Sequence, residues 1–310
     1  MDKSINPQNS KTPGQPVPVI DPNRYQPVEI EPEELPRRRR GLPCGCLSLF
    51  VLVLLVLGVY FFFPTRTNIL LMGIDRTPEG TALGRTDTNI LISIIPLKPT
   101  VNMLSIPRDL WVTIPGVGEN RINTAHFFAE ANQEGSGPEA VLETVRANFG
   151  VTVRYYARVQ FDAFVNIVDA MGGVEVEITT PTAGYDPGVY MLNGEQALAF
   201  ARSRSGSDDF FRMEHGQLLL RAAFNQMLKP ASWPRFPALI ATILQSVDTN
   251  LPVFLWPRLG LAVLRAGPDG IDSRTINRDM VYPWTTNEGA NVLLPNWEAI
   301  NPVLLEMFGE

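Results

Sequence analysis

Arginine and aspartate side chains recur beside the ends of three predicted strands in the first half of the chain. Short apolar runs separated by turn signals predict these strands at residues 69–73, 88–95 and 101–106. Asp75 follows the first strand, and Arg108 follows the third. Arg85 and Asp87, two apart and therefore on one side of an extended chain, precede the second. Because short connections favour antiparallel neighbours, the sequence predicts that these side chains collect at one mouth of a sheet.

A second group of charged residues follows a predicted helix whose N-cap sequence begins at Asn193. The group consists of Arg202, Arg204, Asp208, Asp209 and Arg212. The next predicted helix ends near Leu228. Arginine side chains bind phosphate oxygens with paired hydrogen bonds, so an arginine-rich site indicates an anionic, phosphate-containing ligand.

Carboxylates among these arginines predict a divalent cation. Asp75 and Asp87 would repel each other and an anionic ligand, and Mg²⁺ or Mn²⁺ relieves both repulsions. A cation–arginine clamp also stabilises the charge that develops when a diphosphate is cleaved. The catalytic candidates are Asp75, Asp87, Arg108 and Asp209. Asp75 and Asp209 are both candidates for the base that accepts the proton of an attacking hydroxyl.

Each of these residues alone has a simpler interpretation. A lone Arg or Asp near a turn is usually solvated, and Asp209 can serve only as a helix cap. The two histidines, His126 and His215, are too few and too far apart for a zinc site. The sequence contains no GxSxG or P-loop pattern, which removes the usual support for serine hydrolases and nucleotide-binding folds. The functional hypothesis therefore depends on the convergence of the charges.

Helix and strand signals alternate through the rest of the chain. They predict helices at residues 137–149 and 161–171, and strands at 153–159 and 174–178. The predicted fold class is α/β, with a central mixed β-sheet flanked by helices. The formal net charge is −6, and the chain lacks the basic footprint that nucleic-acid binding requires.

One uncharged segment near the N-terminus predicts a membrane anchor. Residues 41–63 carry no charge, and a helix needs about 20 apolar residues to cross a bilayer. Arginines at 37–40 precede the segment and resist translocation. We therefore expect a single-pass cell-membrane protein with a disordered cytoplasmic tail (1–40), a transmembrane helix (41–63) and an extracytoplasmic catalytic domain (64–310). A cleavable signal peptide fits poorly, because no small-x-small site follows the apolar run.

Several motifs resemble those of the LytR–CpsA–Psr (LCP) family in their order and spacing. The resemblance covers about residues 67–230 and is weaker toward the C-terminus. The matching segments are 68–75 (NILLMGID), 84–88 (GRTDT), 105–109 (SIPRD), 121–123 (RIN), 161–176, 192–204 and 209–212 (DFFR). Any one segment would be a weak signal, but the whole series is specific.

The resemblance implies an LCP-type α/β sandwich with a hydrophobic groove for a polyprenyl chain. It also implies a phosphotransferase that moves a glycopolymer from a polyprenyl-pyrophosphate carrier to a hydroxyl of peptidoglycan. Carried over by motif, Asp75 and Asp87 would hold magnesium. The diphosphate would be bound by Arg85, Arg108, Arg202, Arg204 and Arg212. The implied partners are the lipid-linked glycan, peptidoglycan and membrane lipid.

The sequence departs from the family pattern after Arg212. The family often reads Arg-x-x-Arg-Gln-Gln there, whereas this chain reads RMEHGQ. Gly216 stands where Gln often contacts phosphate, and Gln217 is the candidate substitute. Farther along, four apolar residues either line the lipid groove or, as we favour for most of them, belong to a buried helix: Leu239, Ile240, Ile243 and Leu244.

Two other functions stay open at this point. If water replaces the wall hydroxyl, the same residues make a polyprenyl-diphosphate hydrolase. Alternatively, the protein is a non-catalytic, membrane-anchored, lipid-binding regulator. A transcriptional regulator would need a cytoplasmic DNA-binding domain, and residues 1–36 contain no pattern for one.

Overall fold

The computed structural model describes residues 14, 44–74, 83–203 and 209–309. The predicted site residues Asp75, Arg204 and Asp208 lie outside the described residues, as does the side chain of Asp209. Contacts divide the chain into two units, Met1–Val51 and Leu52–Glu310. The described residues of the first unit are Gly14 and the beginning of helix α1 (Cys44–Phe62).

Helix α1 contains 19 residues and no charged side chain. The side chains at positions 47–57 are exposed. Among the residues that the structure describes, no helix is both long and apolar enough to cross a membrane. The segment 41–63, predicted to be an anchor, begins in residues outside the description, and the anchor stays a prediction.

The second unit is built on a six-stranded sheet with the strand order β10-β3-β2-β1-β6-β9. The strands are β1 (Thr67–Ile74), β2 (Thr86–Ile95), β3 (Thr100–Ile106), β6 (Tyr155–Gln160), β9 (Val247–Thr249) and β10 (Ile271–Thr275). Strands β1, β2 and β3 form the predicted antiparallel meander. Strand β6 lies parallel to β1, and β10 lies parallel to β3. The predicted central mixed sheet is therefore confirmed.

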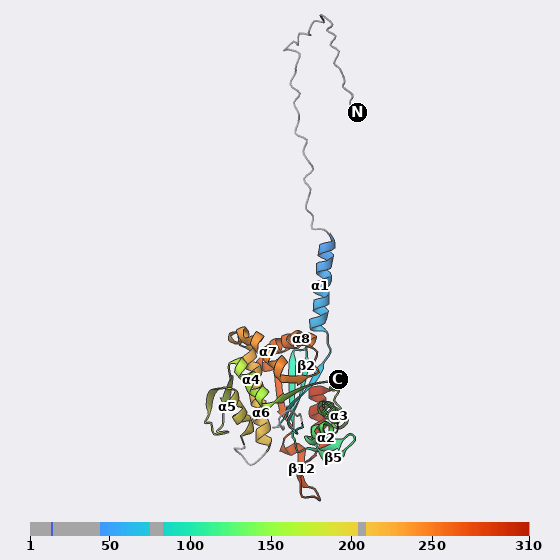
Figure 1. The fold of residues 1–310 in the computed structure, drawn as a ribbon, viewed down its shortest axis with the longest axis vertical. Helices are drawn as coiled ribbons and strands as arrows, with labels where there is room; N and C mark the ends of the chain where they lie inside the picture. Colours follow the sequence, from blue (N-terminus) through green and yellow to red (C-terminus); the bar gives the residue numbers. More distant parts are fainter. Residues whose placement is uncertain (1–13, 15–43, 75–82, 204–208, 310) are drawn as a thin grey trace, which may run out of the picture. The chain divides into compact units, whose positions relative to one another are not determined.

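Helices cover both faces of this sheet (Figure 1). Alternation along β1 sends Leu70 and Met72 to one face and Ile69 and Leu71 to the other. The first face packs against α2 (Thr124–Asn132), α3 (Gly137–Phe149) and α9 (Trp297–Phe308). The second packs against α6 (Asp209–Leu228) and α8 (Trp256–Ala266). Burial on both faces explains why these strands are nearly continuous apolar runs.

A smaller hydrophobic cluster joins α6 to a second group of elements. The group contains α4 (Phe161–Met171), β7 (Val174–Ile178), β8 (Gly188–Leu192) and α5 (Gly194–Arg202), and α7 (Phe236–Ser246) packs on α4. Local signals set the helix limits here. Asn193 and Gln196 form the predicted capping box of α5, and Gly172, with φ 83°, ends α4 in the left-handed region.

Two peripheral hairpins lie side by side. They are β4 (Trp111–Ile114) with β5 (Gly118–Arg121), and β11 (Val281–Thr285) with β12 (Asn291–Pro295). The backbone N–H of Leu293 in β12 donates to Asp109 O just before β4, at 3.0 Å. The remaining short elements are the 3₁₀ turns η2 (Pro230–Arg235), η3 (Val253–Leu255), η4 (Pro268–Gly270) and η5 (Arg278–Met280).

Candidate functional site

The three meander strands bring their charged ends together, as predicted. Ile74 at the end of β1 pairs with Thr86 at the start of β2. Farther along β2, Asn89 pairs with Ile106 at the end of β3. Asp87 follows Thr86 directly, so it lies at the same edge of the sheet as the segment that follows β3.

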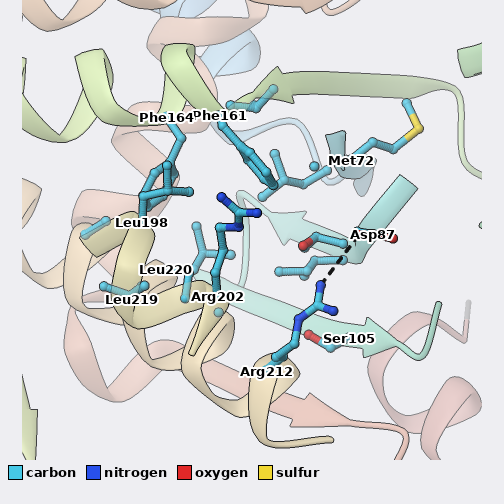
Figure 2. A pocket seen from close by; sticks show the side chains of 18 of the residues that line it. Met72, Asp87, Ser105, Phe161, Phe164, Leu198, Arg202, Arg212, Leu219 and Leu220 are labelled. Carbon is cyan, nitrogen blue, oxygen red and sulfur yellow. Dashed lines mark ion pairs between the residues drawn. The ribbon is translucent and has the colours of Figure 1, made fainter. Parts of the chain in front are cut away.

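A cavity of about 270 Å³ lies between this edge and helices α4, α5 and α6. Figure 2 shows the large apolar side chains that these helices contribute to its wall, namely Phe161, Phe164, Leu198, Leu219 and Leu220. Among the residues that the structure describes, three charged side chains line the same cavity: Asp87, Arg202 and Arg212. An apolar cavity with a few charged groups can accommodate an amphiphile that has an anionic head.

Asp87 lies between two arginines. Its Oδ2 is 3.3 Å from Arg108 Nη1 and 3.7 Å from Arg212 Nη2. Figure 2 marks the pair with Arg212 by a dashed line. The side chains of Asp87, Arg108 and Arg212 are 15%, 23% and 17% exposed, so solvent screens their charges only in part. Two cations facing one carboxylate leave a local positive charge, which attracts phosphate.

The chain of charges continues past Arg108. Its Nε is 3.4 Å from Asp109 Oδ2, and Asp109 Oδ1 is 3.3 Å from Arg121 Nε. Cations and anions therefore alternate from the cavity wall to the first hairpin. Arg121 stood out in the sequence only as part of the RIN segment. Its pairing with Asp109 depends on the β4–β5 hairpin, which the sequence did not predict.

Arg202 approaches the cavity from the C-terminal end of α5. Its guanidinium carbon lies 4.7 Å from the centroid of the Phe161 ring, within cation–π range. Figure 2 shows both side chains. Phe161 is the first residue of α4, and Gln160 beside it also lines the cavity. The first turn of a helix has backbone N–H groups without partners inside the helix, so α4 adds donors at the same place.

Besides Arg108, two predicted diphosphate ligands are not among the described residues that line the cavity. Arg85 is exposed, and its guanidinium carbon is 6.0 Å from the Phe127 ring centroid. Gln217 is buried, and its Nε2 donates to Ser105 Oγ at 2.7 Å and to Arg274 O at 2.6 Å. Gln217 therefore ties α6 to β3 and β10. The phosphate contacts of both side chains stay predictions.

Gly216, by contrast, does line the cavity. A Cβ built at this position would meet no heavy atom within 4 Å. The glycine that replaces the common family glutamine therefore leaves open space beside the charged mouth.

His126 holds the chain just before the charged segment. Arg158 Nη1 lies 3.2 Å from His126 Nε2, and because a guanidinium only donates, Nε2 accepts. The proton is then on Nδ1, which donates to Gly84 O at 2.9 Å. Burial lowers the pKa of His126 below its usual value. Sequence reasoning weighed this histidine only as a zinc ligand and missed its contact with Gly84.

The lipid-groove candidates of the C-terminal half lie elsewhere. Leu239 is buried, whereas Ile240 and Leu244 are 46% and 53% exposed. Leu239, Ile240, Ile243 and Leu244 belong to α7, and none is among the described residues that line the cavity. The apolar wall comes from α4, α5 and α6 instead.

The described residues contain no cluster of three or more His, Cys, Asp and Glu side chains placed to hold a metal ion. Magnesium needs only one or two carboxylates when phosphate oxygens and water complete its shell. Asp87 offers such a carboxylate on the cavity wall, between two arginines. The donor set therefore fits a magnesium ion that arrives with a phosphate ligand.

The fold and the site define a class of protein: a mixed α/β sheet that carries an apolar cavity with a cationic mouth. The sequence profile of the LytR_cpsA_psr family matches residues 64–303. The chain belongs to this family, which confirms the resemblance seen in its motifs.

Three similar proteins illustrate the relationship. The polyisoprenyl-teichoic acid–peptidoglycan teichoic acid transferase TagU of Oceanobacillus iheyensis is 36% identical over 59% of this chain and 58% of its own length. The regulatory protein MsrR of Staphylococcus aureus strain COL is 26% identical over 68% of this chain and 64% of its own. The crystal structure of B. subtilis TagV superposes with a TM-score of 0.65 at 25% identity, covering 79% of this chain and 98% of that one. The chain thus spans less than two thirds of the length of these two curated relatives.

Proposed function

We propose that this protein is a phosphotransferase that moves a glycopolymer from a polyprenyl-diphosphate carrier to a hydroxyl of peptidoglycan. The observation that carries the proposal is the cavity itself. It has a volume of about 270 Å³ and a largely apolar wall, which also contains Asp87, Arg202 and Arg212. The wall suits a lipid chain, and the arginines suit the diphosphate that links chain and glycan. The names of relatives such as TagU, a teichoic acid–peptidoglycan transferase, support the same reaction.

In this reaction the acceptor oxygen forms a bond to the phosphorus that carries the glycan. The bridging P–O bond breaks, and polyprenyl monophosphate leaves with the electron pair. Arg108 and Arg212, both within 4 Å of Asp87, are placed to stabilise the negative charge that develops on the leaving phosphate. One well-placed donor of this kind contributes about 3–4 kcal/mol to transition-state stabilisation. Arg202, which lines the same cavity at the end of α5, would bind the diphosphate as well.

The acceptor proton needs a base. Asp75 and Asp209 are the candidates, as inferred from the sequence. Asp209 begins α6, three residues before Arg212, which supports a place near the mouth. The diphosphate contacts proposed for Arg85, Arg204 and Gln217 would complete the ligand shell.

We further propose magnesium, or manganese, as the cofactor, held by Asp87 and Asp75. When bound, the ion would neutralise phosphate oxygens and polarise the bond that breaks. Asp87 supports this role because its carboxylate lines the cavity between two guanidinium groups that can release it to a cation. The measurement is calorimetric binding of Mn²⁺ in the presence of a soluble diphosphate, in the wild type and in Asp87→Asn.

We also propose that residues 41–63 anchor the protein in the cell membrane, with the catalytic unit outside. The absence of charge from α1 and the exposure of its apolar side chains support this. A carrier lipid stays in the bilayer, so an anchored enzyme lies beside its substrate. The full chain should stay with the membrane fraction after alkaline carbonate extraction, and protease added outside spheroplasts should remove the C-terminal unit.

The central experiment separates transfer from hydrolysis. Labelled lipid-linked glycan and glycan acceptor are incubated with the full chain, and the products are separated. Label on the acceptor supports the transferase, whereas free glycan phosphate without attachment identifies the diphosphate hydrolase.

Variant proteins make this experiment specific to the site. Asp87→Ala and Arg202→Ala should each abolish most product formation. Arg154→Ala is the matched control, because Arg154 is exposed at the opposite end of the sheet, next to the β1–β6 pair Ile69–Tyr155. Full product formation in both site variants would reject the assignment of catalysis to this cavity. If the wild type binds the donor but forms no product, the protein is a non-catalytic lipid-binding regulator; the name of the relative MsrR describes it as a regulatory protein.

A further inference from the structure

An exposed aromatic surface lies beside the charged mouth. The hairpin β4–β5 contributes Trp111, and the hairpin β11–β12 contributes Tyr282 and Trp284. Trp284 is 41% exposed and Tyr282 is 58% exposed. Tyr282 and Trp284 are two apart on one strand, so they project from the same face. We call Trp111, Tyr282 and Trp284 the aromatic ledge.

Contacts between the two hairpins fix this ledge in place. The rings of Trp111 and Trp284 meet edge to face, with centroids 6.0 Å apart and an interplanar angle of 72°. Arg121 Nη2 donates to Asn291 O at 2.7 Å, across the boundary between the hairpins. The rings of Trp111 and Trp284 are therefore already arranged before a ligand binds, which lowers the entropy cost of binding.

Polar groups border the rings. Trp111 Nε1–H points at Glu119 Oε2 at 3.4 Å, and Arg121 is the cross-strand partner of Trp111. A protein partner or a membrane would favour a continuous apolar patch. Ring faces edged by a carboxylate and a guanidinium suit a saccharide better, because sugars present C–H faces for stacking and hydroxyls for hydrogen bonds.

Arg121 joins the ledge to the cavity. Its Nε is 3.3 Å from Asp109 Oδ1, and Asp109 Oδ2 is 3.4 Å from Arg108 Nε. Arg108 in turn pairs with Asp87, which lines the cavity. A saccharide on the ledge would therefore lie at the end of a chain of charged groups that starts where the diphosphate is proposed to bind.

We propose that the aromatic ledge binds the acceptor, an N-acetylated amino-sugar glycan strand of the peptidoglycan type. One sugar ring would stack on Trp284 or Tyr282, and the hydroxyl of a neighbouring sugar would extend past Arg121 toward the phosphorus. This inference rests on the proposed transferase function and adds to it the place where the acceptor is held.

The test measures use of acceptor and use of donor separately. Soluble, uncrosslinked glycan strands are titrated into the full chain by calorimetry, for the wild type, Trp284→Ala and Tyr282→Ala. Each variant should weaken glycan binding about tenfold, the equivalent of one aromatic contact. In the transfer assay, KM for the acceptor should rise while KM for the lipid-linked donor stays unchanged. Trp233→Ala is the control, because Trp233 is 51% exposed on η2, outside the ledge.

A measurement on the wild type tests the inference even if a ledge variant fails to fold. Added glycan strands should shift the NMR signal of the Trp111 indole N–H and leave that of Trp233 in place. Unchanged glycan affinity in both variants, or an unshifted Trp111 signal, overturns the inference. The failure of the proposed function gives a different result: glycan binds at the ledge, but the wild type attaches no donor glycan to it.

Discussion

Replacing Arg108 with alanine removes a guanidinium that lies between two carboxylates. Arg108 Nη1 is 3.3 Å from Asp87 Oδ2, and Arg108 Nε is 3.4 Å from Asp109 Oδ2. At these distances a pair of unit charges near a protein surface interacts by about 5 kcal/mol before desolvation is counted. Without Arg108, Asp87 still faces Arg212 at 3.7 Å and Asp109 still faces Arg121 at 3.3 Å. The mouth loses one of the positive charges that attract a diphosphate.

The expected loss in catalysis is large, and the loss in stability is small. One donor to a developing phosphate charge contributes about 3–4 kcal/mol, so Arg108→Ala should lower kcat/KM for the lipid-linked donor by roughly 100- to 1000-fold. Partly exposed ion pairs contribute only about 0–1 kcal/mol to folding, so the Tm should fall by a few degrees at most. Arg108→Lys should fall between the wild type and Arg108→Ala, because lysine keeps the charge but lacks the fork.

The assay follows radiolabelled donor glycan onto soluble glycan acceptor at low donor concentration, with thermal unfolding measured on the same protein preparations. Arg154→Ala serves as the control for removal of an arginine. The reasoning is refuted if Arg108→Ala keeps activity within threefold of the wild type, or if its activity loss is matched by a large fall in Tm.

Three further predictions concern the cavity and its supports. Gly216→Gln fills open space beside the mouth and replaces a glycine inside a helix. The variant should be more stable by about 0.5–1 kcal/mol, which raises the Tm by a few degrees, and the KM for the donor should fall. A lower Tm would contradict this prediction. Ala201→Trp places a large ring in the apolar cavity, so it should abolish binding of the lipid-linked donor, measured by calorimetry, while a short-chain soluble diphosphate still binds. Burial lowers the pKa of His126 and of His215 below the usual 6.5. As the pH falls below 6.5, the unfolded chain therefore binds more protons than the folded chain does, and the folded state loses stability in that range. His126→Asn keeps a donor for Gly84 O but does not titrate, so urea unfolding should show a smaller loss between about pH 7.5 and pH 5 than in the wild type; an equal loss would assign the effect to His215.

The meander and its charged mouth could be predicted because their signals are local. Short apolar runs separated by turn signals predicted β1, β2 and β3, and the antiparallel path then placed Asp87 beside Arg108. The capping box at Asn193 and the glycine at Gly172 set helix limits in the same way. The arrangement of these segments in space follows from a few turns, which the sequence records directly.

The features that were missed depend on contacts between distant segments. Strand β10 pairs with β3 across more than half of the domain, and nothing near Ile271 signals that partner. In β11, Pro283 weakens the strand signal of the sequence, because proline is rare inside sheets. Helix α7 is as rich in apolar residues as the wall of a lipid cavity would be, but the helices that line the cavity are α4, α5 and α6. Hydrophobicity alone does not tell which apolar surface stays uncovered.

The pairing of β10 with β3 also bears on how the protein is made. Residues 100–106 form an edge of the sheet until residues 271–275 arrive to pair with them. A nascent chain that stops earlier would present an open row of backbone donors and acceptors to other chains. Pairing between segments so far apart in the sequence slows folding, and β10 then becomes the outermost strand on this side of the sheet. Proteolytic clipping between α8 and β10, followed by loss of the C-terminal fragment, should for the same reason expose β3 and promote aggregation.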